Sequence, residues 1–209
     1  MKHNGIMKRE HCLEKRNYAF YAPLSQGDLT DHISGQHLQI SAGCSCVWNA
    51  TENAYFFDST NYTNSYGTPF SWNELSVFSN TSLSVDSYSY EIEWDAKYVD
   101  CRFVQGRGAS RCTPVFGYVE SGNIYLYLNI TGYDWFFNNN PYVWNHYKFV
   151  ASGGTRNLYC NNALMNTASA TKMGGKNDYM NRLSLYMIYY WPQNQCGSGY
   201  IRNITAALL

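Results

Sequence analysis

The stretch Ser-Tyr-Ser-Tyr-Glu-Ile-Glu-Trp-Asp-Ala, residues 87–96, alternates polar and large apolar side chains almost without a break. The even positions carry Tyr, Tyr, Ile, Trp and Ala, and the odd positions carry Ser, Ser, Glu, Glu and Asp. Because successive side chains of a strand point to opposite faces of its sheet, this period of two predicts a strand with one buried and one solvent-facing side. Such a strand is typical of an antiparallel sheet that covers a core on one face only.

Strands of the same kind are expected on both sides of this stretch. They cover residues 98–104, 115–119, 123–130, 146–150, 157–160, 183–190 and 200–206. The connecting segments are rich in turn residues, such as Ser121-Gly122-Asn123, and no helical period is sustained after residue 17. Roughly ten to fourteen short strands predict an all-β protein, a two-sheet antiparallel jelly-roll sandwich.

The composition agrees with an all-β protein and narrows the function. Among the 209 residues are 20 Tyr, 10 Phe and 6 Trp, which are residue types that favour strands. Lys and Arg total 15, as do Asp and Glu. A nucleic-acid partner is therefore not expected, because nucleic-acid-binding proteins carry a surplus of basic residues. No membrane association is expected either, since no apolar run has the length of a membrane-spanning helix.

The first 17 residues differ from the remainder of the chain. They hold five Lys or Arg, two Glu and no Phe, Tyr or Trp. We expect an N-terminal arm over residues 1–17 and a single β-sandwich domain over residues 18–209. No apolar segment follows the basic residues, so a secretory signal is not expected. The seven cysteines are irregularly spaced, which predicts reduced thiols and not a disulfide framework.

Several short motifs follow one another in an order that points to a fold family. They are Phe20-Tyr21-Ala22-Pro23-Leu24, Asp31-His32-Ile33-Ser34-Gly35, Ala54-Tyr55-Phe56-Phe57-Asp58, Tyr90-Glu91-Ile92-Glu93-Trp94, Trp144-Asn145-His146-Tyr147-Lys148-Phe149 and Gly199-Tyr200-Ile201-Arg202-Asn203-Ile204. Together they resemble a concanavalin A-like jelly roll of the laminin G type, as seen in tailed-phage virion proteins. Where that family has an Asp-Gly hairpin turn, this chain has Asn161-Asn162, which keeps the left-handed turn geometry.

The strongest candidate for catalysis is the row formed by Glu91, Glu93 and Asp95. In laminarinase-like glycosidases of the same sandwich class, one strand presents alternate carboxylates to the sugar. Here the three acids share one face of the expected strand, about 7 Å apart. Their acid lengths are permuted relative to that pattern, so we favour a charged solvent face over a glycoside hydrolase. We expect no enzyme, no cofactor and no metal site.

Binding fits the sequence better than catalysis does. Loops rich in Asn, Tyr and Trp suit sugars, because aromatic rings stack on pyranose faces while amides bond the hydroxyls. The candidate contact residues are Trp135, Phe136, Asn138, Tyr142, Trp144, Tyr190 and Trp191. Tyr and Trp are also enriched at protein interfaces, so contact with a glycan and contact with a protein both stay open.

The resemblance and the expected absence of a signal together predict a location. A protein made in a host cytoplasm and used outside the cell fits a phage virion, released on lysis. We expect a homo-oligomeric virion surface protein (a capsid decoration, head-fibre or tail-fibre module). Residues 1–17 would attach it to other virion proteins, and host-surface or mucus glycans would be its ligands. The alternative is a carbohydrate-binding adhesin.

Overall fold

The computed structural model of the chain describes residues 17–59, 61–62, 70–73, 90–100, 102–103, 105–106, 116–120, 123–127, 134–137, 140, 142–152, 155–169, 182–185 and 198–209. Over these ranges the chain forms strands and turns and contains no helix, as the sequence predicts. In the same ranges no helix is long and apolar enough to cross a membrane.

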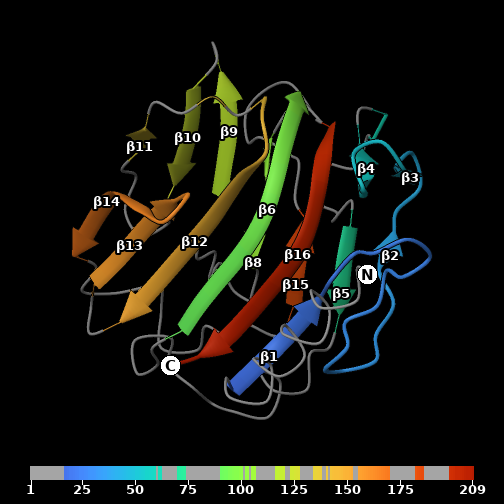
Figure 1. The fold of residues 1–209 in the computed structure, drawn as a ribbon, viewed down its shortest axis with the longest axis horizontal. Coiled ribbons are helices and arrows are strands. Elements are labelled where there is room, and N and C mark those ends of the chain that lie inside the picture. The colour runs from blue at the N-terminus through green and yellow to red at the C-terminus, as the bar shows by residue number, and fades with distance from the viewer. Residues whose placement is uncertain are drawn as a thin grey trace, which may run out of the picture.

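The largest layer is an eight-stranded antiparallel sheet (Figure 1). Seven of its strands lie in the order β14 (Ala163–Ser169), β13 (Thr155–Cys160), β12 (Asn145–Ser152), β6 (Tyr90–Asp100), β16 (Ser198–Leu208), β4 (Ala54–Asp58) and β3 (Ser45–Asn49). The eighth strand, β1 (Asn17–Ala22), pairs with one end of β16. The two longest strands, β6 and β16, lie side by side at its centre.

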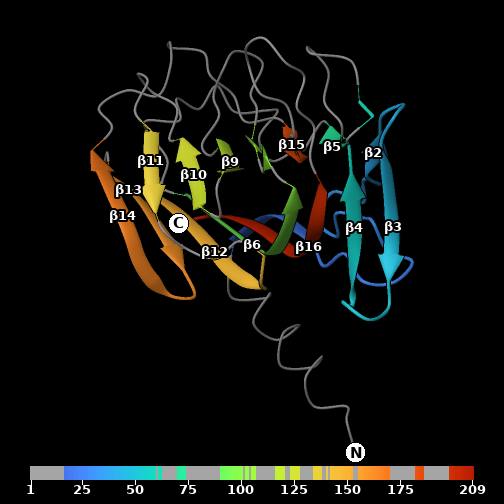
Figure 2. The same ribbon diagram turned by 90° about the horizontal axis from the view of Figure 1, so that it is seen from above.

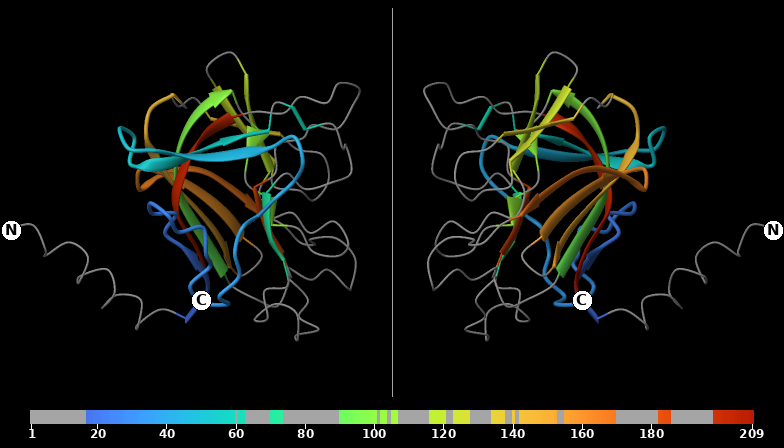
Figure 3. Two further views of the ribbon diagram at one scale, coloured as in Figure 1. Left: turned by 90° about the vertical axis from the view of Figure 1, so that its right-hand side faces the viewer. Right: turned by 90° about the vertical axis from the view of Figure 1, so that its left-hand side faces the viewer.

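Two smaller sheets form the opposing layer. One has the order β11 (Asp134–Phe137), β10 (Asn123–Tyr127), β9 (Phe116–Glu120) and β7 (Arg102–Phe103); the other has the order β2 (Gln39–Ile40), β5 (Phe70–Asn73), β15 (Arg182–Leu185) and β8 (Gln105–Gly106). Both lie on the same side of the large sheet, which curves around them (Figure 2). The edge-on views in Figure 3 show the two layers of the expected sandwich.

The core lies between these layers and is largely aromatic. Phe57 of β4 packs edge to face on Phe70 of β5, with ring centroids 5.1 Å apart. Phe20 of β1 meets Trp72 of β5 at 5.1 Å in the same manner. Because each pair joins the large sheet to the small one, these rings fix the spacing between the layers.

The strand that decides the fold behaves largely as its alternation predicts. Ile92, Trp94 and Ala96 of β6 are buried in the core, and the acidic side chains between them lie on the other face. One expectation is wrong: residues 98–104 were expected to form a separate strand, but β6 runs on through Asp100. Lys97 and Tyr98 continue the alternation of residues 90–96, so the pattern gives no reason for the strand to end at Ala96.

The turn between β13 and β14 has the geometry expected from its two asparagines. Asn161 and Asn162 have φ values of +50° and +67°, and Cys160 pairs with Ala163 across the turn. A two-residue hairpin with both central residues in the left-handed region is a type I′ turn, which asparagine tolerates. The prediction for Asn161-Asn162 is confirmed.

The loop after β1 is organised by a buried carboxylate. Asp31 has no exposed surface, and it accepts hydrogen bonds from the backbone N–H groups of Tyr21, Ile33 and Ser34 and from the Ser34 hydroxyl. The bond from Tyr21 ties the loop to β1, and the other three close the loop on itself. β1 begins at Asn17, one residue earlier than expected, and residues 1–16 of the expected arm lie outside the described residues.

Three of the seven cysteines, Cys44, Cys46 and Cys160, lie within the described residues, and none of these three forms a disulfide bond. They are buried or partly buried against the core. Burial raises the pKa of the Cys46 thiol to about 12, so this group stays protonated and unreactive at neutral pH. The expectation of reduced thiols holds for these three.

Candidate functional site

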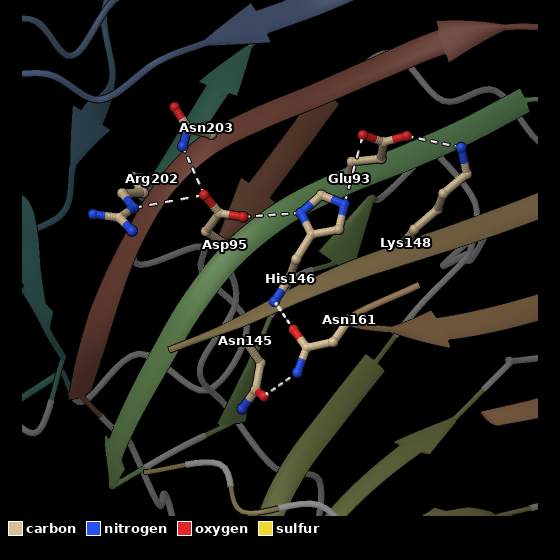
Figure 4. Close-up of polar contacts among 8 residues, drawn as sticks. All are labelled: Glu93, Asp95, Asn145, His146, Lys148, Asn161, Arg202 and Asn203. Atoms are coloured by element: carbon tan, nitrogen blue, oxygen red, sulfur yellow. Dashed lines mark hydrogen bonds and ion pairs between the residues drawn. The ribbon is translucent and has the colours of Figure 1, made fainter. Parts of the chain in front are cut away.

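The outward face of the large sheet carries a dense polar network across β6, β12 and β16 (Figure 4). The acids of β6 face cations of β12, because the register places Asp95 opposite His146 and Glu93 opposite Lys148. Lys148 forms ion pairs with both Glu91 and Glu93. Glu91 is only 5% exposed, so the expected solvent-facing row is buried at this end.

His146 joins the two acids at the other end of the row. Its Nδ1 lies 2.9 Å from Asp95 Oδ1, and its Nε2 lies 3.7 Å from Glu93 Oε2. The backbone N–H of His146 donates to Asn161 Oδ1 at 2.9 Å, which holds the start of β12 against the β13–β14 turn. The imidazole is therefore positioned from two sides.

Asp95 is bound on its far side by β16. Asn203 Nδ2 donates to Asp95 Oδ2 at 2.6 Å, and Arg202 Nε lies 3.5 Å from the same oxygen. The register of β16 shifts between Arg202 and Thr205, and Asn203 has a φ of +55° there. This bulge turns two consecutive polar residues toward one carboxylate, which a regular strand would not do.

The protonation equilibria follow from these contacts. Burial alone would raise the pKa of Asp95, but the hydrogen bonds from His146 and Asn203 outweigh it and the pKa is lowered. The hydrogen bond to Asp95 raises the pKa of His146 above its ordinary value, although burial opposes it. For Lys148, burial would lower the pKa, but the bonds to Glu91 and Glu93 raise it.

These directions oppose a catalytic role for the acids. A glycosidase needs one carboxyl group with a raised pKa as its general acid, as well as an ionised partner that can reach the sugar. Here the pKa of Asp95 is lowered, and Glu91 and Glu93 are bound by Lys148. The row is an ion-pair network that joins three strands, which fits the charged-face interpretation better than the hydrolase.

The same network predicts a pH dependence of stability. A raised His146 pKa contributes stability that is complete below its ordinary value of 6.5 and is lost as the pH rises through the folded-state pKa. A lowered Asp95 pKa contributes stability above its ordinary value of 3.8 that is lost as the pH falls through its folded-state pKa. The ion pair of His146 and Asp95 therefore stabilises the fold most between pH 3.8 and pH 6.5.

We expect this contribution to disappear in His146→Gln, which cannot carry the charge. The Tm of the native chain should fall between pH 5 and pH 8 by more than the Tm of the variant does. Differential scanning calorimetry of both proteins at the two pH values measures this. An equal change of Tm in both proteins would contradict the assignment.

A second group of side chains lies on the same face, centred on Trp144. The indole Nε1–H of Trp144 donates to Glu52 Oε2 at 3.0 Å. The guanidinium carbon of Arg202 lies 4.1 Å from the centre of the Trp144 ring, and the ring of Tyr200 lies 6.4 Å away. Cation–π contact and the indole bond together fix the orientation of a partly exposed tryptophan.

The surroundings of Trp144 extend this group toward β3 and β4. Lys97 pairs with Glu52 and lies 5.6 Å from the centre of the Tyr200 ring. Asn49 donates to the Tyr200 hydroxyl at 3.1 Å, and its Oδ1 accepts from the backbone of Glu52. We name this set the Trp144 cluster; it consists of Asn49, Glu52, Lys97, Trp144, Tyr200 and Arg202.

The side chains of the Trp144 cluster are partly exposed to solvent and are also held in place by their contacts with one another. The side chains of Lys97, Glu52 and Arg202 are 27%, 21% and 30% exposed. Hydrogen bonds from Lys97 and Trp144 lower the pKa of Glu52, so the carboxylate is charged over the whole neutral range. A surface of this kind offers aromatic rings and fixed hydrogen-bonding groups to a ligand without a large loss of side-chain entropy.

The structure brings together only part of the contact set predicted from the sequence. Trp144 lies in the cluster, and Tyr142, two residues before it, is 46% exposed. Trp135 and Phe136 are in β11, where the backbone pairs with Leu126 and Tyr125 of β10. Asn138, Tyr190 and Trp191 lie outside the described residues.

Sequence reasoning missed the partners of Trp144. Asn49, Glu52, Lys97, Tyr200 and Arg202 come from three distant regions of the chain, and only the pairing of β16 with β4 and β6 makes them neighbours. In the ranges that the structure describes, no group of His, Cys, Asp and Glu could hold a metal ion.

No protein-family model matches the chain, and no curated protein matches its sequence. Its fold, however, is similar to that of several solved structures. One is a structure of botulinum neurotoxin type C, whose cell entry is described as dependent on interaction with two ganglioside molecules. It has a TM-score of 0.62 at 13% identity, over 95% of this chain and 49% of that chain.

Two further structures give the same result. The botulinum neurotoxin serotype D binding domain has a TM-score of 0.62 at 11% identity, over 91% of this chain and 47% of that chain. The binding domain of Paraclostridial Mosquitocidal Protein 1 has a TM-score of 0.59 at 11% identity, over 91% and 48%. The chain thus spans about half the length of each structure. At such low identity the likeness establishes the fold alone: an all-β sandwich shared with part of each of these three structures.

Proposed function

We propose that this protein is a non-enzymatic carbohydrate-binding domain and that the Trp144 cluster is its contact surface. The observation that carries the proposal is the ordered, partly exposed Trp144, which is bonded to Glu52 and covered on its ring by Arg202. Around it lie carboxylate, amide and ammonium groups that reach the surface on the same face of the sheet.

This arrangement matches the chemistry of a sugar. One face of a pyranose ring is apolar and packs on an aromatic side chain, while its hydroxyl groups both donate and accept hydrogen bonds. The exposed ring of Tyr142 and the edge of Trp144 supply the apolar contact. Glu52 and Asn49 supply acceptors and donors beside it.

The comparisons support the proposal at the level of the fold. Of the three structures named above, two are described as binding domains and one by its interaction with two ganglioside molecules. The pairing of Glu91, Glu93 and Asp95 within the outward face also favours binding over hydrolysis.

The test is binding of the purified chain to an array of host and bacterial glycans, followed by variants. We expect saturable binding that Trp144→Ala weakens by at least about tenfold, which corresponds to about 1.4 kcal/mol. Trp144→Phe should retain part of the affinity, because the ring remains while the indole bond is lost. Circular dichroism establishes that each variant is folded.

Tyr159→Ala is the matched control. Tyr159 is a partly buried aromatic side chain of β13 on the same sheet, and it lies outside the cluster. This variant should bind like the native chain. If Trp144→Ala binds with native affinity, the Trp144 cluster is not the contact surface; if no glycan is bound at all, the proposed function is wrong.

We further propose that this binding domain acts on the surface of a phage virion, attached through the residues before β1. The support is the resemblance of the motif order to tailed-phage domains and the basic character of residues 1–16, which hold five Lys or Arg and two Glu. Removing residues 1–16 removes none of the described strands, since β1 begins at Asn17. The shortened protein should remain folded but no longer bind particles in a sedimentation assay; unchanged binding would refute the anchor.

A further inference from the structure

We infer that the ligand of the Trp144 cluster is an uncharged saccharide, and that sialylated, sulfated or uronic-acid glycans are excluded. The inference rests on the proposed function and specifies its ligand class. It follows from how the charges of the outward face are paired with one another.

Every cation whose side chain the structure describes on this face already has an anionic partner. Lys97 is paired with Glu52, and Lys148 is paired with Glu91 and Glu93. Arg202 is held between the Asp95 carboxylate and the face of the Trp144 ring. An anionic ligand group would therefore have to compete with an existing carboxylate for each of these cations.

The charge balance of the face also opposes an anion. The network and the cluster contain the four carboxylates Glu52, Glu91, Glu93 and Asp95. Against them stand Lys97, Lys148 and Arg202, so four minus three leaves one negative charge while His146 is neutral. Protonation of His146 brings the sum to zero and not to a positive value. A carboxylate or sulfate approaching this face meets no attractive field.

An uncharged sugar, by contrast, can form hydrogen bonds with this face without charge repulsion. Each oxygen of Glu52 accepts one described hydrogen bond, from Lys97 or from Trp144. A carboxylate oxygen has two lone pairs, so Glu52 can accept further bonds at its exposed edge. A sugar hydroxyl that donates to an ionised carboxylate forms a short, charge-assisted bond. This face therefore favours ligands with hydroxyl donors. Neutral saccharides supply such donors and carry no anionic group that the carboxylates would repel.

The experiment uses matched glycan pairs printed on one array. Neutral gluco-, galacto-, manno- and N-acetylglucosamine oligomers are compared with the same oligomers carrying a terminal sialic acid or a 6-sulfate. We expect the full chain to bind at least one neutral oligomer. Its affinity for the charged counterpart should be lower by a factor of about ten or more. Equal or tighter binding of the charged member overturns the inference and leaves the proposed function standing. Binding of neither member of any pair overturns both.

A charge variant tests whether Glu52 causes the discrimination. In Glu52→Gln the acceptor charge is lost and Lys97 is released, so neutral binding should weaken about tenfold. The penalty for the charged counterpart should shrink at the same time. Asp28→Asn is the matched control, because Asp28 is likewise a paired acid, bonded to His32 at 2.6 Å and outside the cluster. If Glu52→Gln and Asp28→Asn show the same neutral-to-charged ratio as the native chain, Glu52 does not select the ligand and the inference is wrong.

Discussion

Replacing Trp94 with alanine should destabilise the fold by about 3–5 kcal/mol, the usual range for removing a large aromatic side chain from a core. Trp94 is 1% exposed and lies in the central strand β6. Its ring stacks on Tyr147 of β12, with centroids 5.4 Å apart and planes 22° from parallel. The alanine variant loses this contact and leaves a cavity beside the sheet centre.

The measurement is equilibrium unfolding in urea, followed by circular dichroism. Because single domains are commonly stable by only about 5–15 kcal/mol, the variant should unfold at a much lower denaturant concentration. Trp94→Phe should lose less, since an aromatic ring remains against Tyr147. A loss below about 1 kcal/mol in Trp94→Ala would mean that the site is not part of a packed core.

Replacing Asp31 with alanine should cost about 3 kcal/mol or more, by a different mechanism. The substitution leaves three backbone N–H groups, those of Tyr21, Ile33 and Ser34, without their acceptor. Hydrogen bonds to a carboxylate group contribute about 1.5–3 kcal/mol each. The effect should be concentrated in the loop and in β1, which the bond from Tyr21 connects.

Two companion variants separate the carboxylate from its surroundings. Ser34→Ala removes one donor to Asp31 and leaves the three backbone bonds intact, so its loss should be small. Asp31→Asn keeps the shape but replaces one acceptor oxygen with a donor, so its loss should be intermediate. Urea unfolding combined with limited proteolysis of the loop checks the order. Equal stability of Asp31→Ala and Ser34→Ala would show that the backbone bonds contribute nothing.

Local patterns predicted the parts of the fold that depend on local chemistry. The alternation around Ile92 and Trp94 identified the buried face of β6, and Asn161-Asn162 identified a left-handed hairpin turn. The strand was nevertheless predicted to end at Ala96, whereas β6 runs on to Asp100. Lys97 and Tyr98 continue the alternation, and the Lys97 ammonium group bonds to Glu52, 45 residues away in sequence.

The candidate site was only partly predictable, for a related reason. Trp144 was identified because a loop rich in Asn, Tyr and Trp suits a sugar ligand. Its partners Glu52 and Arg202 are ordinary charged residues whose importance arises from strand order and from the bulge at Asn203. A single sequence carries no signal for which strands become neighbours. It equally gave no sign that Glu91 would be buried beneath Lys148.

The position of β16 has a consequence for how the molecule forms. This strand, residues 198–208, lies between β6 and β4 and also pairs with β1, so Asn17 meets Leu208 and Tyr55 meets Ile201. These contacts span most of the chain, and their closure costs conformational entropy before any strand pairing is gained. On a ribosome, β6 can pair with β12 and β4 with β3, but the edges of β4 and β6 that bind β16 stay open until residues 198–208 have emerged. Assembly of the large sheet is therefore a late and slow event, completed only once β16 has been synthesised.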